Sequence, residues 1–165
     1  MSENKKVIFV PHCLLNHNVR VNRRDKTTKD LIELFLDADV GIVQIPCPEV
    51  EFNGGLNRSI RSKKAYDTKN YRNYCRKLSL EILENVEKYL KAKYNVLGIL
   101  GVEFSPTCAV HRIDNGKKIV PGKGILIEEL ETEMQKKNFQ VPLIPTNLNN
   151  IFSTIENLDI LLKNC

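Results

Sequence analysis

The chain has 165 residues, of which 42% are hydrophobic and 27% charged, as in one globular domain with a buried core. Its net charge of +5, from 25 Lys and Arg against 20 Asp and Glu, falls short of the concentrated basic surface of a dedicated nucleic-acid-binding protein. The charged N-terminus does not resemble a signal peptide, and no apolar run approaches the roughly 20 residues of a membrane span. We therefore expect a cytoplasmic protein that forms a single domain over residues 1–165, without a membrane or nucleic-acid partner.

Short apolar runs rich in β-branched residues alternate with segments whose apolar residues recur every three or four positions. The runs predict strands over residues 6–10, 40–45, 96–102 and 141–145. The periodic segments predict helices that begin after Thr27 or Thr28 and that cover 71–92, 125–137 and 150–163. The polar segments 62–70 and 111–123 are expected to be loops. This alternation predicts a three-layer α/β/α, Rossmann-like fold with a mainly parallel sheet of about four or five strands.

The five cysteines are an odd number in a chain expected to be cytoplasmic, which argues against a disulfide framework. A free cysteine is most often a small buried hydrophobe, and Cys75, within an expected helix, fits that description. Cys13, Cys47 and Cys108 differ because each follows an expected strand and a proline. The carboxyl ends of parallel strands meet at one edge of a sheet, so we expect these three thiols to share a metal site. Three thiolates are one fewer than the usual four ligands of an iron–sulfur cluster, and they would leave one iron open.

Other polar residues lie near these cysteines in the sequence. Gly54 and Gly55 lack side chains and would let the backbone approach a ligand, so we take them, with Arg20, as candidates for substrate binding. A negatively charged cluster would give some nearby arginines a reason to face inward; these are Arg20, Arg23, Arg58 and Arg61. The three histidines are weaker candidates because loop histidines are more often solvated. His12 and His17 could complete a metal site, and His111 could act on substrate.

Three segments resemble the signature blocks of the thiouracil desulfurase (desulfidase) family: CLLNHNVR from Cys13, CPEVEFNGGL from Cys47 and SPTC from Ser105. The resemblance implies that Cys13, Cys47 and Cys108 bind a [4Fe-4S] cluster with one iron that the protein does not ligate. It also implies catalytic roles for Glu49 and Ser105. Departures such as Asn16 and Ala109, where the family usually has glycine, indicate a divergent member.

The function expected from this resemblance is the non-redox desulfuration of a small thiocarbonyl compound, such as a thiolated nucleobase, with release of sulfide. The open iron would polarise the carbon–sulfur bond, Glu49 would act as general base toward water, and Ser105 would position that water or relay its proton.

Two other classes stay open at the level of sequence. One is a zinc hydrolase or deaminase in which the three cysteines hold zinc, although the deaminase signature of a histidine two before a glutamate and a later CxxC is absent. The other is a non-catalytic iron–sulfur sensor or sulfur carrier.

Overall fold

A computed structural model describes residues 5–21 and 28–165. Four parallel strands form the central sheet in the order β2-β1-β3-β6; they are β1 (Lys6–Pro11), β2 (Val40–Ile45), β3 (Asn95–Val102) and β6 (Leu143–Thr146). The chain builds outward from β1 first on one side and then on the other. The order therefore reverses between β1 and β3, and such a switch point opens a crevice at the carboxyl ends of the strands.

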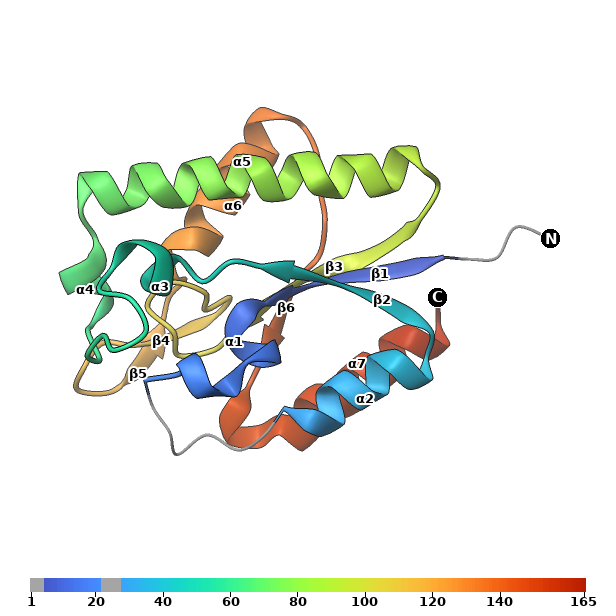
Figure 1. Cartoon of the computed structure of the whole chain (residues 1–165), viewed down its shortest axis with the longest axis horizontal. Helices are drawn as coiled ribbons and strands as arrows, with labels where there is room; N and C mark the ends of the chain where they lie inside the picture. Colours follow the sequence, from blue (N-terminus) through green and yellow to red (C-terminus); the bar gives the residue numbers. More distant parts are fainter. Residues whose placement is uncertain (1–4, 22–27) are drawn as a thin grey trace.

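Helices cover both faces of the sheet (Figure 1). One face is covered by α5 (Lys69–Lys91) and α6 (Ile125–Lys136), and the other by α2 (Lys29–Asp37) and α7 (Ile151–Lys163). Alternate residues of β1 supply the two cores: Val7 and Phe9 pack on the α5 side, and Ile8 and Val10 on the α2 side. The predicted three-layer α/β/α fold is confirmed, with four strands in the parallel sheet.

The longest helix, α5, has a clear origin in the sequence. Thr68 is its N-cap, and the Thr68 side chain accepts a hydrogen bond from the backbone N–H of Tyr71. Buried residues then recur at helical spacing along the helix and pack on the sheet; they include Tyr71, Cys75, Leu78, Ile82 and Val86. The cap fixes where α5 begins, and with it the position of Tyr71.

Several short elements gather at the carboxyl edge of the sheet, where sequence periodicity gave no signal. They are α1 (His12–Leu15), the 3₁₀ helix η1 (His17–Val19), α3 (Pro48–Phe52), α4 (Lys63–Tyr66), the antiparallel strands β4 (Arg112–Asp114) and β5 (Ile119–Pro121), and the 3₁₀ helix η2 (Leu148–Asn150). The prediction of loops over 62–70 and 111–123 was therefore wrong in part, since these segments contain α4 and the β4–β5 hairpin. Three- and four-residue elements are too short for a periodic pattern and depend on tertiary contacts.

Two predicted boundaries also need correction. Thr28 stands at the N-cap position of α2, but its hydroxyl donates to the carbonyl of Leu14 instead of accepting from the helix, and Thr27 lies outside the described residues. The fourth strand begins at Leu143, two residues later than predicted. Among the helices that the structure describes, none combines the length and apolar character needed to cross a membrane.

Candidate metal centre

The three strand-following cysteines lie together at the carboxyl edge of the sheet. Cys13 is the second residue of α1, directly after β1; Cys47 is the N-cap residue of α3, after β2; and Cys108 lies in the loop that follows β3. All three line an open cavity of about 320 Å³. Glu49 and Ser105 line the same cavity, so the structure brings together the five residues to which the sequence analysis gave ligand or catalytic roles.

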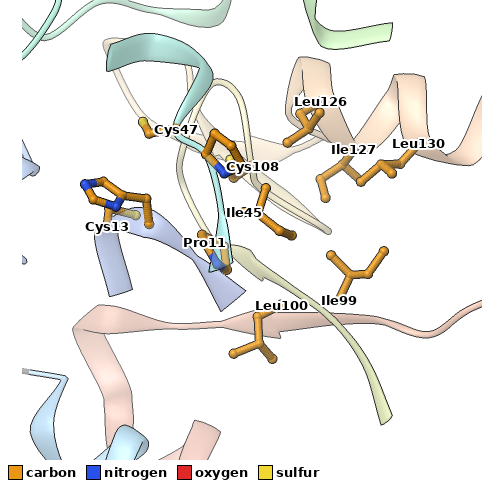
Figure 2. Close-up of a pocket in the computed structure, with 12 residues that line it drawn as sticks. Pro11, Cys13, Ile45, Cys47, Ile99, Leu100, Cys108, Leu126, Ile127 and Leu130 are labelled. Carbon is orange, nitrogen blue, oxygen red and sulfur yellow. The ribbon is translucent and has the colours of Figure 1, made fainter. Parts of the chain in front are cut away.

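A second, much smaller cavity of about 20 Å³ lies on the other side of the thiols. Figure 2 shows the three cysteines on one side of it and aliphatic side chains on the other, among them Ile45, Ile99, Leu126, Ile127 and Leu130. The lining is largely aliphatic, so a water molecule there would lack the polar partners that it needs to be stable. The thiols therefore separate the open cavity from these aliphatic side chains, which we call its apolar floor.

The electrostatics of the three thiols disfavour their charged forms. Burial, with a further contribution from the neighbouring Cys47, raises the pKa of Cys13 to about 12. Burial also raises the pKa of Cys108 well above its usual value, and Cys47 and Cys13 add to the effect. The pKa of Cys47 is raised by burial too, although the backbone N–H of Val50 acts in the opposite direction. Thiolates crowded in this way are stabilised by a bound cationic metal centre, because metal binding displaces the thiol protons.

The donor set has the chemistry of an iron–sulfur site. Within residues 5–21 and 28–165, no group of three or more His, Cys, Asp or Glu side chains could hold a metal ion. Three soft sulfur donors around one cavity are the ligand type that iron–sulfur clusters require.

The loop that carries Cys108 is tightly fixed. The Oγ of Ser105 accepts hydrogen bonds from the backbone N–H groups of Thr107, at 3.1 Å, and Cys108, at 3.0 Å. The first N–H groups of α6, those of Ile125 and Leu126, donate to the carbonyls of Pro106 and Thr107. Because Ser105 holds the turn, its oxygen has a structural role beside any role toward substrate, while its O–H remains a donor.

Two glycines that the sequence analysis overlooked permit this packing. A Cβ on Gly124 would lie 2.2 Å from the carbonyl carbon of Thr107, and a Cβ on Gly101 would lie 2.5 Å from the carbonyl oxygen of Cys108. Both contacts are with backbone, which cannot swing away. The recurrence of glycine within an apolar strand and directly before a helix was the available signal.

Glu49 lies in the first turn of α3 and is held from two sides. Its Oε1 accepts a hydrogen bond of 2.9 Å from the Thr107 hydroxyl, and its Oε2 lies 3.2 Å from Nε of Arg58. The Glu49 side chain is 12% exposed and that of Arg58 is 6% exposed, so this ion pair is largely but not fully shielded from solvent. Arg58 also donates to the carbonyl of Val19, at 3.1 Å, which fixes its guanidinium.

The candidate substrate-binding residues divide between the cavity and a nearby turn. Arg20 is buried, lines the cavity, and donates from Nε to the carbonyl of Cys13 at 2.9 Å. Gly54 and Gly55 do not line the cavity; their φ angles of +97° and +72° make a turn that brings Arg58 back to Glu49. Arg61 lines the cavity from an exposed position, whereas Arg23 lies outside the described residues.

The other cysteines and two of the histidines lie apart from this group, whereas His12 lines the small cavity together with the three thiols. Cys75 is fully buried in the core, as its helical position predicted, and Cys165 is exposed at the chain end. The Nδ1 of His12 lies 3.0 Å from the side-chain oxygen of Gln44, and His12 lines only the small apolar cavity. The remaining two histidines are exposed and line neither cavity; they are His17 and His111.

Comparison with solved structures defines the class of fold. The "[4Fe-4S]-dependent thiouracil desulfidase TudS (DUF523Vcz)" superposes with a TM-score of 0.53, covering 94% of this chain and 99% of that chain at 18% identity. At this identity the likeness shows the fold alone, and the chain is an α/β/α protein with a DUF523-like fold.

The comparison with known sequences identifies the family. The chain is 31% identical over 166 residues to "Uncharacterized protein MJ0003" of Methanocaldococcus jannaschii, covering 98% of this chain and 99% of that protein. The chain therefore belongs to the family of MJ0003. None of the family models searched matches it.

Proposed function

We propose that the protein is a [4Fe-4S]-dependent desulfidase that removes sulfur from a small thiocarbonyl compound, such as a thiolated nucleobase, and releases it as sulfide. The observation that carries the proposal is the convergence of three thiols, Glu49 and Ser105 on one cavity. The similar fold of the solved desulfidase supports the same class of reaction.

In this proposal Cys13, Cys47 and Cys108 hold the cluster at the boundary between the apolar floor and the open cavity. When bound, the cluster supplies an iron without a protein ligand, which acts as a Lewis acid toward the substrate sulfur. The larger cavity, which all three thiols line, would give a substrate access to that iron.

The chain's own residues handle water and its proton. Glu49 accepts a proton from the water that attacks the thiocarbonyl carbon, and the Ser105 O–H orients that water. The carbon–sulfur bond is replaced by a carbon–oxygen bond and sulfur leaves as hydrogen sulfide, so water is the co-reactant and no electrons are gained or lost. Arg20 lines the cavity, and its positive charge favours the departure of an anionic sulfur.

Sulfide release tests this function directly. Anaerobically purified protein is incubated with thiouracil, and both sulfide and the oxo product are measured. We expect equal amounts of both without added oxidant or reductant. Iron-loaded protein that releases no sulfide from thiouracil or related thiopyrimidines would contradict the proposal and favour the sensor or sulfur carrier. Turnover that depends on zinc in iron-free protein would favour the hydrolase.

A further inference from the structure

We propose that Thr107 and Tyr71 are positioning residues that fix the carboxylate of Glu49 through a directed chain of hydroxyl groups. This inference rests on the proposed function, since it concerns the residue assigned there as general base. Neither residue was a candidate from the sequence.

The chain of hydrogen bonds is continuous, and it is fully buried at the link between Tyr71 and Thr107. The Thr107 hydroxyl donates to Glu49 Oε1 at 2.9 Å, and the Tyr71 hydroxyl lies 2.9 Å from the Thr107 hydroxyl. Tyr71 is fully buried and Thr107 is 1% exposed. Water therefore does not compete for the bond between the two hydroxyls, and in such surroundings that bond is stronger than at a surface.

The direction of the chain follows from counting hydrogens. A carboxylate is acceptor only, so Thr107 must donate its single hydroxyl hydrogen to Glu49. That hydrogen is then committed, and Tyr71 must be the donor in the bond between the two hydroxyls. Burial raises the pKa of Tyr71, which keeps it a neutral donor.

Both hydroxyl-bearing residues are themselves held in place. The backbone of Thr107 is fixed by the first turn of α6 and by the close approach of Gly124. The ring of Tyr71 packs against Phe52 of α3, with centroids 5.7 Å apart, and against Tyr66 of α4, at 5.6 Å. One oxygen of the Glu49 carboxylate is thus held by Thr107 on a fixed loop. Thr107 is in turn held by Tyr71 on α5.

This arrangement has a consequence for the reaction. Thr107 and Arg58 each occupy one carboxylate oxygen, and an ionised carboxylate offers about four lone-pair positions, so further positions remain for water. Fixing the carboxylate plane decides where those positions point. A misplacement of about 1 Å in a catalytic group can lower a rate by about a hundredfold.

The test compares Thr107→Val, which removes only the hydroxyl, with Thr107→Ser, which retains it. We expect Thr107→Val to keep its iron and sulfide content and its KM, and to lose about 10- to 100-fold in kcat. Thr107→Ser is expected to restore kcat to within about threefold of the parent. Tyr71→Phe should give a smaller loss, about threefold, because Thr107 keeps its own bond to Glu49. Tyr74→Phe, which removes the same atom one turn along α5, is the matched control and should match the parent.

A crystal structure of Thr107→Val provides a readout that does not need activity. We expect the Glu49 carboxylate to rotate away from its parent position while the backbone of α3 stays in place. An unmoved carboxylate, or equal losses in the valine and serine variants, would overturn the inference. If the parent released no sulfide, the proposed function would fail, and the position of the carboxylate would still decide this inference.

Discussion

At the scale of single residues, Glu49 is the proposed general base and also a residue whose side-chain contacts the structure defines clearly. Its carboxylate lines the cavity with the three thiols and is held by one neutral and one charged donor. Arg58 forms an ion pair with Glu49. The sequence alone predicts instead that inward-facing arginines neutralise the negative charge of a cluster. Two separate effects of substitution follow, one on chemistry and one on stability.

The first prediction concerns chemistry. Glu49→Gln keeps the size of the side chain and an oxygen acceptor, but it removes the basic carboxylate. We expect the anaerobic variant to retain the absorbance of the cluster and to lose sulfide release. Glu51→Gln on the same short helix is the control, since Glu51 is exposed and lines neither cavity. Retained turnover in the Glu49 variant would exclude it as the base.

The second prediction concerns stability. Arg58→Met leaves the partly buried Glu49 carboxylate without its charged partner, and we expect a loss of about 2 kcal/mol in unfolding free energy, less than for a fully buried pair. Urea unfolding of the cluster-free protein at pH 7 measures the difference. Arg61→Met removes the same charge from an exposed position and should change the stability by less than about 0.5 kcal/mol. Equal effects of the two substitutions would show that the ion pair does not contribute.

At the scale of elements, the site depends on how the loop after β3 packs on the start of α6. The carbonyls of Pro106 and Thr107 accept the first N–H groups of α6, and Gly124 leaves room for the approach. One packing contact thus places Cys108, Thr107 and, through Thr107, Glu49.

The third prediction tests this contact. Gly124→Ala would put a methyl group 2.2 Å from the Thr107 carbonyl carbon, so loop and helix must separate. We expect a loss of about 2 kcal/mol in unfolding free energy and a lower iron content per chain. Gly41→Ala on the edge strand β2 is the comparison, because its methyl would come no closer than 3.2 Å to the Val7 side chain and 3.5 Å to the carbonyl oxygen of Lys6. Full cluster loading in Gly124→Ala would show that the loop tolerates the shift.

The regular elements could be predicted from the sequence because their apolar periodicity is long and uninterrupted, as in β3 and α5. The contacts of Glu49 could not, since its partner Thr107 is 58 residues away and only the tertiary fold joins them. Gly54 and Gly55 illustrate a related limit. A glycine pair indicates unusual backbone geometry, but the sequence does not say whether that geometry serves a ligand or a turn.

At the scale of the whole molecule, the core is built from apolar side chains on both faces of the sheet. Two apolar clusters, one on each face of the sheet, are built from strands and from the helices that cover them. The three cysteines lie at the carboxyl edge, outside the centre of either cluster.

The fourth prediction follows from that separation. Removing the cluster with a chelator and an oxidant, followed by reduction of the thiols, should leave the helical circular dichroism and a cooperative unfolding transition. A zinc-finger-like domain would instead unfold, because its metal supplies the folding energy. Loss of the cooperative transition in cluster-free protein would show that the cluster is part of the core.

We propose that Cys13, Cys47 and Cys108 together hold one [4Fe-4S] cluster, and iron and acid-labile sulfide analysis of anaerobically purified protein decides whether they do. We expect about four irons and four sulfides per chain in the parent, and loss of both when any of the three cysteines is changed to serine. Cys75→Ala and Cys165→Ser should keep the full content. Stoichiometric zinc in place of iron, or an undiminished iron content in Cys108→Ser, would contradict it.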